Sequence, residues 1–508
     1  MKLLSVAITH HDANLARVDG CDVRYIKLER TRQEKRFQLQ SPLDWKRACE
    51  EVWGAGSAEA DDYAFSLDPA SLPASLQRHV RPDALARLAG GASNAEPLPA
   101  AVCDYLGVPR GWLVSHHTLH ALSTWMLERR PADVRIVIDG VGDARAWSVY
   151  RADKLVAVGD IRNGSIGWGM REAGKLLGIS YGHYNDIAGK LMGLQAFGRV
   201  DEEFLQRLSR FGMTELRELW APQHWEAHKR DTLLARHSLL DWAATVHRRT
   251  GELLLEFFRQ HVREDEVVSY SGGVAQNVVW NTALKQAFPK LLIPPHASDE
   301  GLSLGGIEWL RRRHGLALLE WPDFPFAQSD VAVPPPSDHT INAAAQVLAQ
   351  GRLLAWYQGP GEVGPRALGN RSILMDARLP HGKELLNRVK RRELYRPFGA
   401  SVLASHYAQH FAGAPDAFML QACRVRGPEF PAITHVDQSC RVQAVDAGQQ
   451  AFHALLTRFH HLTGSPVLAN TSLNLAGRPL AGFPENAVQL FHDSPLDALV
   501  VGDRVYLK

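Results

Sequence analysis

A buried strand followed by a glycine turn and a helix is the feature that most constrains the fold of this chain. The apolar run Glu266–Tyr270 predicts a strand, Ser271-Gly272-Gly273 predicts a tight turn, and the pattern from about Ala275 predicts a helix. This arrangement presents backbone N–H groups at the start of a helix, where they can bind phosphate. It is typical of α/β sheets, in which ligands collect beyond the carboxyl ends of the strands.

Two further predicted strands also end in polar residues. Leu3–Ile8 runs into His11 and Asp12, and Val134–Ile138 delivers Asp139 at its carboxyl end. Three groups of polar residues are therefore expected at the same kind of strand end, and we predict an α/β fold class.

Proline-rich stretches interrupt this pattern near residue 330. Trp321–Pro325 and Pro334–Pro336 bracket a segment with little periodicity, which indicates a linker. A predicted helix over Ile341–Ala349 opens a second region of mixed helices and strands. We therefore predict two domains, residues 1–330 and 338–508.

The composition is that of a globular protein with few biased segments. The 508 residues are 45% hydrophobic and 22% charged, and the net charge of +2 argues against nucleic acid and membrane surfaces as partners. The five cysteines form no CxxC pair, which argues against a zinc ribbon and a disulfide framework. Residues 55–100 are rich in Ala, Ser, Asp, Pro and Gly, and we expect mostly surface loops there.

No apolar run reaches the length of a membrane span, and the apolar start Met1–Ile8 is too short for the core of a signal peptide. A cytoplasmic enzyme is therefore the expectation.

The loop Gly361–Leu374 carries two arginines, Arg366 and Arg371, among three glycines and a proline. Glycines allow backbone N–H groups to approach a ligand closely, and the arginine fork matches phosphate or carboxylate oxygens. The loop is therefore predicted to hold a small oxyanion. The alternative is an ordinary turn with two solvated arginines.

Two histidines four residues apart predict a metal site. His116 and His120 lie in a predicted helix over Val114–Arg130, and this spacing places them on the same helix face. Asp139 follows a strand, and Asp299 lies in a turn. Two nitrogens and two carboxylate oxygens suit Fe(II), Mn or Zn. Alternatively, the histidines only cap and pack the helix end.

His11 is a candidate general base, because a histidine can accept a proton near neutral pH. It directly follows a predicted strand and precedes Asp12. The alternative is a structural histidine at a strand end.

Six further sequence blocks accompany the arginine loop and give the chain a resemblance that runs through nearly its whole length. They are His11-Asp12-Ala13, His116-His117-Thr118-Leu119-His120-Ala121, Lys190-Leu191-Met192-Gly193-Leu194, Ser271-Gly272-Gly273-Val274-Ala275-Gln276-Asn277, Thr434-His435-Val436-Asp437 and Asn470-Thr471-Ser472-Leu473-Asn474. In this order they resemble the carbamoyltransferases that carbamoylate hydroxyl groups in antibiotic and nodulation-factor biosynthesis.

The resemblance implies a fold and a reaction. The N-terminal domain would be a duplicated actin-like (ASKHA, Kae1-like) domain with metal and nucleotide sites, and the C-terminal domain would be a YrdC-like α/β domain. The implied enzyme binds carbamoyl phosphate and ATP, with Mg accompanying ATP, and forms carbamoyl adenylate. The adenylate passes internally to the metal site, where a hydroxyl of a small-molecule acceptor, such as a natural product or sugar, takes the carbamoyl group. A homodimer is compatible with this function.

The resemblance also implies roles for individual residues. His11 with Asp12 would act as the general base, and His10 stands where the family usually has a glycine. The iron-like ion would be held by His116, His120, Asp139 and Asp299. The nucleotide would contact Lys190, Gly193, Gly272, Gly273 and Asn277. Carbamoyl phosphate would contact Arg366, Lys390, Arg396, Arg441, Asn470, Ser472, Asn474 and Arg478.

Arg478 stands where the family more often has an acidic residue. In the basic stretch around Lys390, Arg391 and Arg392 fit a solvated helix face better than a binding site.

Other functions are compatible with parts of this pattern. A tRNA threonylcarbamoyl-type enzyme shares the two fold types, but the near-neutral chain argues against tRNA as a partner. Hydrogenase-maturation carbamoyltransferases carry cysteine-rich zinc modules, which are absent from this sequence. A non-catalytic metal- or nucleotide-binding regulator is compatible with the fold, but it leaves the arginine loop and His11 without a purpose.

Overall fold

The computed structural model describes residues 1–9, 11–39, 44–67, 72–77, 94–180, 182–229, 239–328 and 333–508, so His10 lies outside the described residues. The chain forms two compact units. One consists of Met1–Asp22 and Gln38–Glu320, and the other of Val23–Phe37 and Trp321–Lys508. The segment Val23–Phe37 therefore belongs to the C-terminal unit. A single domain boundary near residue 330 would assign this segment to the N-terminal domain. None of the helices in the described ranges has the length and apolar character needed to cross a membrane.

The first sheet has its central strand inside a region expected to be mostly loops. Its strands are β1 (Lys2–Ile8), β2 (Asn14–Asp19), β3 (Asp22–Lys27), β4 (Asp62–Leu67), β5 (Ala95–Pro97) and β6 (Trp112–Val114), in the order β3-β2-β1-β4-β6-β5. β1 is antiparallel to β2 and parallel to β4, and β4 is parallel to β6. Every residue of β4 is buried, so the prediction of surface loops over residues 55–100 is wrong for this strand. The strand has only six residues, so the polar composition of the surrounding region concealed it in the sequence.

The second sheet repeats the plan of the first. Its strands are β7 (Val134–Gly142), β8 (Arg145–Arg151), β9 (Lys154–Asp160), β10 (Val268–Ser271) and β11 (Leu291–Leu292), in the order β11-β10-β7-β8-β9. β7 is antiparallel to β8 and parallel to β10, as β1 is to β2 and β4. The first unit therefore contains two α/β halves of the same topology, in which β1 corresponds to β7 and β6 corresponds to β11.

The helices of the first unit include two that occupy corresponding places after β6 and β11. They are α6 (His116–Leu122) and α14 (Leu302–Arg313). The others are α2 (Asp44–Trp53), α3 (Ala74–Gln77), α5 (Ala100–Leu106), α7 (Ile166–Leu176), α8 (Asn185–Leu194), α9 (Glu202–Leu208), α10 (Leu216–Leu219), α11 (Pro222–His228), α12 (Leu239–His261) and α13 (Val278–Ala287). The helix predicted over Val114–Arg130 is shorter than expected, because it ends at Leu122 and a 3-10 turn follows over Trp125–Leu127.

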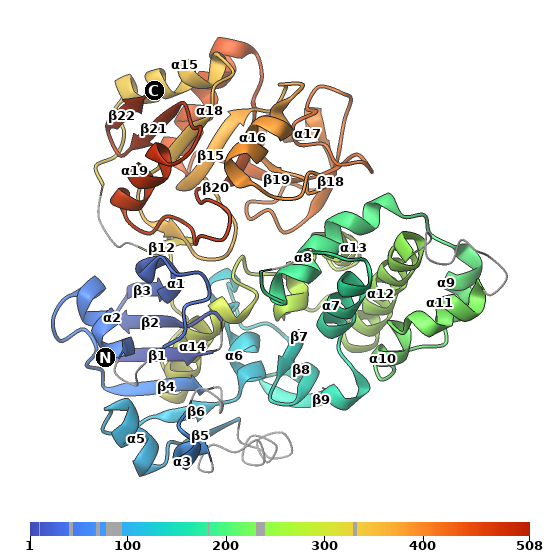
Figure 1. Ribbon diagram of the computed structural model, residues 1–508. Helices are drawn as coiled ribbons and strands as arrows, with labels where there is room; N and C mark the ends of the chain where they lie inside the picture. Colours follow the sequence, from blue (N-terminus) through green and yellow to red (C-terminus); the bar gives the residue numbers. More distant parts are fainter. Residues whose placement is uncertain are drawn as a thin grey trace. The chain divides into compact units, whose positions relative to one another are not determined.

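Two glycines bring α14 close to both α6 and the first sheet (Figure 1). A Cβ on Gly305 would lie 1.9 Å from the carbonyl oxygen of Leu119 in α6, and one on Gly306 would lie 2.0 Å from Oγ of Ser5 in β1. Only glycine allows such close packing. The turn before α14, which contains Asp299, is thereby held beside α6 with its two histidines.

The second unit is built on a mixed sheet of nine strands. They are β13 (Leu354–Tyr357), β15 (Arg371–Asp376), β16 (Gly399–Leu403), β17 (Phe411–Ala412), β18 (Ala422–Val425), β19 (Ser439–Val445), β20 (Val467–Ser472), β21 (Ala498–Val501) and β22 (Arg504–Leu507), in the order β17-β18-β19-β16-β20-β15-β13-β21-β22. A short pair, β12 (Phe326–Gln328) and β14 (Gly361–Glu362), accompanies it.

Helices cover both faces of this sheet, and each face has its own apolar core. The helices of this unit are α1 (Leu28–Arg32), α15 (Asp338–Ala349), α16 (Gly382–Lys390), α17 (Tyr407–His410), α18 (Gln450–Thr463) and α19 (Pro484–His492). The core with α15 and α18 includes Trp356 and Phe459, whereas the core with α16 and α19 includes Leu386 and Leu490.

Candidate functional site

The helix α6 presents two histidines toward the same point. It begins directly after β6, and its N-cap residue is Ser115. The Nε2 atoms of His116 and His120 lie 3.1 Å apart, and the His120 side chain is fully buried. Oγ of Ser271, at the end of β10, donates a 2.7 Å hydrogen bond to the carbonyl oxygen of His120, which ties α6 to the second sheet.

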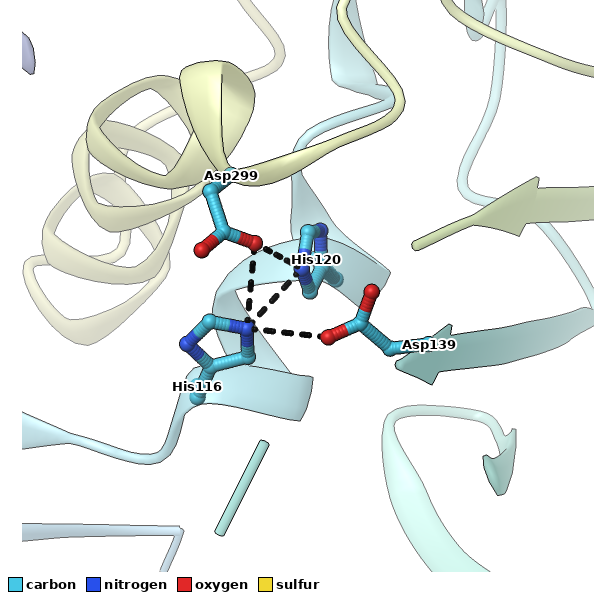
Figure 2. Close-up of side chains that lie close together, drawn as sticks. All are labelled: His116, His120, Asp139 and Asp299. Carbon is cyan, nitrogen blue, oxygen red and sulfur yellow. Dashed lines mark hydrogen bonds and ion pairs between the residues drawn. The ribbon is translucent and has the colours of Figure 1, made fainter. Parts of the chain in front are cut away.

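Two carboxylates complete the group, which we name the His–Asp cluster (His116, His120, Asp139 and Asp299). The Nε2 of His116 lies 3.5 Å from Oδ2 of Asp139 and 3.4 Å from Oδ1 of Asp299. The Nε2 of His120 lies 3.3 Å from the same Oδ1 of Asp299. The four ligand atoms all lie within 4.8 Å of one another. Figure 2 shows the four side chains pointing toward one another. The structure therefore brings together all four predicted metal ligands.

Backbone geometry sets the position of Asp139. The parallel pairing of β7 with β10 ends at Val137, and the ladder to β8 is irregular between Ile138 and Gly142. Asp139 thus lies just beyond the regular pairing, and its Oδ1 accepts a 2.7 Å hydrogen bond from the N–H of Gly273. Gly142 leaves room for the adjacent ligand, because a Cβ there would lie 2.4 Å from Cδ2 of His116.

The predicted base lies beside this cluster. Nδ1 of His11 is 2.6 Å from Oδ2 of Asp12, and Nε2 of His11 is 3.7 Å from Oδ2 of Asp299. Asp12 therefore orients the ring so that the second nitrogen faces the cluster. The ring of His183 lies 6.3 Å from that of His11, between centroids.

Asn14 links the turn that contains His11 to the turn that contains Asp299. This residue was not identified from the sequence. Its Nδ2 donates to the carbonyl oxygens of Asp12, at 2.5 Å, and of Asp299, at 2.9 Å. Its Oδ1 accepts from the N–H of Ser303 in α14. A fully buried asparagine with these partners holds the His11 turn against the Asp299 turn. Its signal in the sequence was only a polar residue within the first strand pair.

The electrostatics of the cluster favour a bound cation. Burial alone would raise the pKa of Asp139, but the hydrogen bond from His116 and nearby histidines lower it to about 2. Burial opposes ionisation of His116 and His11 as well. Nevertheless Asp299 and Asp139 raise the pKa of His116 well above 6.5, and Asp12 and Asp299 raise that of His11 to about 9. Two imidazole nitrogens and two anionic oxygens fit Fe(II), Mn or Zn. His117 is not part of this group, because its Nδ1 faces Oγ of Ser148 at 2.8 Å.

The residues predicted for the nucleotide fall into two groups. Gly272 and Gly273 adjoin the cluster; Gly272 has φ +95°, and a Cβ on it would lie 2.3 Å from the carbonyl oxygen of Ile138. Lys190 and Gly193 lie on α8, where Nζ of Lys190 donates to the carbonyl oxygen of Ser180 at 2.6 Å.

Asn277 is the N-cap of α13 rather than an open donor. Its Oδ1 accepts from the N–H groups of Val279 and Trp280, and its Nδ2 is 3.0 Å from Nε2 of His247. The helix predicted from about Ala275 accordingly begins at Val278, after a 3-10 turn over Gly273–Gln276.

In the second unit, Lys390 forms the centre of a basic site. Its Nζ lies at the end of α16 and donates to Ser472 and Asn474, to the carbonyl oxygens at 2.6 and 2.7 Å and to the side-chain oxygens at 3.1 and 2.6 Å. Burial, and then the positive charges of Arg392, Arg396 and Lys35, hold the pKa of Lys390 well below its ordinary 10.5.

Three arginines surround this lysine, and we name the group the cationic cluster (Lys390, Arg392, Arg396 and Arg441). Burial and the charge of Arg396 lower the pKa of Arg441 to about 10, even though Cys440 acts in the opposite sense. Burial and the charges of Arg396 and Arg441 hold the pKa of Arg392 well below 12.5. Glu393 lies 3.6 Å from Arg396 and is one carboxylate beside four cations. Such an excess of positive charge in a largely buried place fits a multiply charged anion.

The prediction that Arg392 is on a solvated helix face is wrong. Its guanidinium lies over the Phe398 ring, 3.8 Å from the centroid, and donates to the carbonyl oxygen of Pro397 at 3.0 Å. The helix α16 ends at Lys390, and Arg391 follows it in the left-handed conformation with φ 43°. Arg392 is therefore outside the helix and turns into the cluster, whereas Arg391 is exposed.

The two arginines of the glycine loop have different tasks. Arg371 is buried and donates to the carbonyl oxygens of Gln358, Gly359 and Ala481, so it holds the loop. The Glu362 carboxylate accepts from the N–H groups of Leu368, Asn370 and Arg371 and closes the turn. Arg366 remains half-buried at the tip and is the ligand candidate of this loop.

Arg30 reaches the same loop from the segment Val23–Phe37, and sequence reasoning did not find it. Its guanidinium donates to the carbonyl oxygens of Glu362 and Gly364, four and two residues before Arg366. The side chain is buried. No local pattern signals this role, because the partners are more than 300 residues away in the chain.

The polar block on β20 supports the basic site in several ways. Nδ2 of Asn470 donates to the carbonyl oxygen of Ala367 at 3.3 Å and to Oγ of Ser401 at 2.9 Å, so Asn470 braces the loop beside Arg366. Oγ of Ser472 donates to Oδ1 of Asn474 at 2.6 Å. Arg478 is exposed, and its carbonyl oxygen accepts from Nδ2 of Asn474.

Comparisons with known proteins match both units. Residues 103–307 match the family model described as Carbamoyltransferase N-terminus, and residues 345–508 match the one described as Carbamoyltransferase C-terminus. The Nodulation protein NolNO of Sinorhizobium fredii is 31% identical over 454 residues, which cover 78% of this chain and 64% of that protein. The 3'-hydroxymethylcephem-O-carbamoyltransferase of Amycolatopsis lactamdurans is 32% identical over 348 residues, which cover 63% of this chain and 64% of that protein. The chain thus spans just under two thirds of the length of these two relatives.

Solved structures add little to this result. A ROK hexokinase from Thermus thermophilus covers 61% of this chain and 100% of its own, with 15% identity and a TM-score of 0.31, a likeness too low to bear on fold or function. The family models carry the assignment, because the N-terminal match includes all four residues of the His–Asp cluster and the C-terminal match includes the whole cationic cluster. This chain belongs to the carbamoyltransferase family, a family of enzymes.

Proposed function

We propose that the protein is an O-carbamoyltransferase that uses ATP and carbamoyl phosphate, forms carbamoyl adenylate, and transfers the carbamoyl group to a hydroxyl of a small molecule. Family membership supports carbamoyl transfer. One observation carries the rest of the proposal: the chain combines a cluster that suits a cation with a cluster that suits a phosphate-bearing anion.

The second unit is proposed as a YrdC-like domain that handles the donor. The cationic cluster and Arg366 bind the phosphate oxygens of carbamoyl phosphate. Water cleaves the donor to carbamate and phosphate, and a carbamate oxygen then attacks the α-phosphorus of ATP. Pyrophosphate leaves with Mg, and carbamoyl adenylate is formed. The buried amines and guanidinia exclude bulk water from this exchange.

The first unit is proposed as a duplicated actin-like domain that carries out the transfer. The acceptor oxygen attacks the carbamoyl carbon, the bond from that carbon to the adenylate oxygen breaks, and AMP leaves. Nε2 of His11 takes the proton, because Nδ1 is engaged with Asp12. Gly272 and Gly273 approach the nucleotide through their backbone, while Asn277 shapes the turn as a helix cap.

The His–Asp cluster would hold Fe(II), or alternatively Mn or Zn, through His116, His120, Asp139 and Asp299. A divalent ion there would stabilise negative charge on the nucleotide phosphate and lower the pKa of His11 through the repulsion of like charges.

Pyrophosphate release from ATP tests the proposal. In iron-reconstituted, anaerobic protein we expect release only when carbamoyl phosphate is present, and loss of release in Arg366→Ala. His120→Ala should retain pyrophosphate release but fail to transfer the carbamoyl group. The absence of carbamoyl-phosphate-dependent release from the reconstituted wild type would disprove the adenylation chemistry.

A further inference from the structure

A buried carboxamide without partners lies next to the cationic cluster. Asn387 is on α16 and is 8% exposed, and among the described residues neither its Oδ1 nor its Nδ2 has a hydrogen-bond partner. Buried side-chain amides are nearly always paired, because an unpaired donor or acceptor loses its hydration without compensation. An amide with both ends unpaired therefore indicates a ligand group that the carboxamide is shaped to receive.

The position of Asn387 relates it to the proposed donor site. It precedes Lys390 by three residues, so both side chains leave α16 on the same, buried face. Lys390 reaches Ser472 and Asn474 at the end of β20. Leu386 and Val389, which directly precede Asn387 and Lys390 in the chain, belong to the apolar core. Asn387 is thus a polar residue at the border between the core and the cationic cluster.

The chemistry of a carboxamide differs from that of the surrounding cations. Lysine and arginine offer only donors, which suit phosphate oxygens. Asparagine offers a donor and an acceptor in one plane. A carbamoyl group carries the complementary pair, a carbonyl oxygen and an NH₂ group, whereas an acetyl group of the same shape lacks the NH₂ donor.

We propose that Asn387 is a specificity-determining residue that binds the carbamoyl end of the donor, with its Nδ2 donating to the carbamoyl oxygen and its Oδ1 accepting from the carbamoyl NH₂. The proposal rests on the proposed function in taking carbamoyl phosphate as the donor. It divides the work of the site: the cationic cluster binds the phosphate of any acyl phosphate, and Asn387 selects the acyl group.

Binding measurements on the full-length chain without ATP test this division. Carbamoyl phosphate, acetyl phosphate and inorganic phosphate are titrated into wild type, Asn387→Leu and Asn387→Ala. We expect the wild type to bind carbamoyl phosphate about 10-fold or more tightly than acetyl phosphate, since the analogue leaves Oδ1 unpaired. Both variants should bind the three anions with nearly equal affinity, close to that of wild type for acetyl phosphate. Lys390→Met serves as the contrasting control and should weaken binding of all three.

Thermal stability separates recognition from a packing role. Leucine has nearly the shape of asparagine and removes two unpaired polar atoms, so the melting temperature of Asn387→Leu should stay the same or rise. A preference for carbamoyl phosphate that persists in both variants would overturn the inference, and so would a lower melting temperature together with equal weakening of all three anions. Wild type that binds phosphate but does not prefer carbamoyl over acetyl phosphate would also overturn it. Wild type that binds none of the three would instead overturn the proposed donor site as a whole.

Discussion

The two clusters of this protein are electrostatic opposites: buried carboxylates dominate the first, and buried cations dominate the second. In the first unit, two buried aspartates face two histidines, and the low pKa of Asp139, about 2, shows how strongly the site favours positive charge nearby. In the second unit, one lysine and three arginines lie together, and burial and the repulsion of like charges lower the pKa values of Lys390, Arg392 and Arg441. Such arrangements cost folding free energy unless a ligand of opposite charge binds. The first cluster is suited to a cation and the second to an anion.

The clusters also differ in how the fold assembles them. The His–Asp cluster and His11 beside it come from corresponding places in the two halves of the first unit. His11 follows β1 and Asp139 lies in the corresponding strand β7, while His116 and His120 open α6 after β6 and Asp299 precedes α14 after β11. The cationic cluster instead comes from one short stretch that begins with Lys390, the last residue of α16, together with Arg441 on β19. The His–Asp cluster is shared between the two halves, so its geometry requires the correct packing of α14 on α6. The geometry of the cationic cluster depends mainly on the turn that follows α16.

The largest expected effect follows from removing one aspartate of the His–Asp cluster. Asp299→Asn keeps the size of the side chain but removes the anionic oxygen that both histidines face. We expect metal affinity and carbamoyl transfer to fall by at least about 100-fold, because a ligand contributes no less than its supporting residues. Carbamoyl-phosphate-dependent pyrophosphate release should stay near wild type.

Asp201→Asn is the matched control for that substitution. The pKa of Asp201 is also lowered to about 2, against the effect of burial, by Lys229 and backbone N–H groups, but it lies outside the cluster. Metal content by elemental analysis should fall only in Asp299→Asn. Equal loss of metal in both variants would contradict a specific site.

The converse test removes the central cation of the second unit. Lys390→Met should raise the KM for carbamoyl phosphate by about 100-fold, since charge-assisted hydrogen bonds to a buried anion are worth about 1.5–3 kcal/mol each. Metal content should be unchanged. Lys383→Met is the control, because Lys383 is on the same helix, has a pKa lowered by burial and donates to the carbonyl oxygen of Thr434. An equal rise in KM for both variants would show that the effect is structural.

Close packing around His116 gives a smaller effect. A Cβ at residue 142 would lie 2.4 Å from Cδ2 of His116, so Gly142→Ala must displace the imidazole. We expect metal affinity to fall about 10-fold, as for changes that misorient a ligand. Gly140→Ala, two residues earlier, meets nothing within 4 Å and should bind metal like wild type. Competition with a chelator of known affinity measures both, and equal affinities would show that His116 tolerates the added methyl group.

Local motifs predicted much of the candidate site, while distant partners could not be predicted. The spacing of His116 and His120 fixed their common helix face, and strand ends indicated Asp139 and His11. Arg30 and Asn14 escaped notice because each acts through backbone carbonyls that are close only in the folded chain. Arg392 was misjudged because α16 ends two residues before it, and helix ends are poorly marked in the sequence.

The fold shows the same limit. The strands β1 and β10 were predicted to within one or two residues, since each is a short apolar run ending in polar residues. The start of β7 was predicted at Val134, but the strand continues four residues beyond the predicted end at Ile138, to Gly142. The buried strand β4 was missed in its polar surroundings, and the repeat of the two sheets left no periodicity to detect. Strand order and direction, rather than sequence similarity, reveal the duplication. The place of the segment Val23–Phe37 in the C-terminal unit could not be predicted either. A short stretch that packs with a unit distant in the chain carries no local sequence pattern that indicates it.

The smallest expected effect concerns the pH dependence of the free energy of unfolding, and it comes from Lys390 in the cationic cluster. The pKa of Lys390 is well below 10.5 in the folded chain, mainly through burial, so the unfolded chain binds more protons between the lowered value and 10.5. The free energy of unfolding should therefore rise with pH in that window, by at most about 1.4 kcal/mol per pH unit. The contribution of Lys390 to this slope should be lost in Lys390→Met, so the free energy of unfolding should rise less steeply with pH than in wild type. Saturating phosphate should also flatten the slope, because a bound anion favours the charged amine. Denaturant titrations over this range measure the slope, and a slope that is the same in wild type and Lys390→Met would mean that the lysine is already compensated in the free protein.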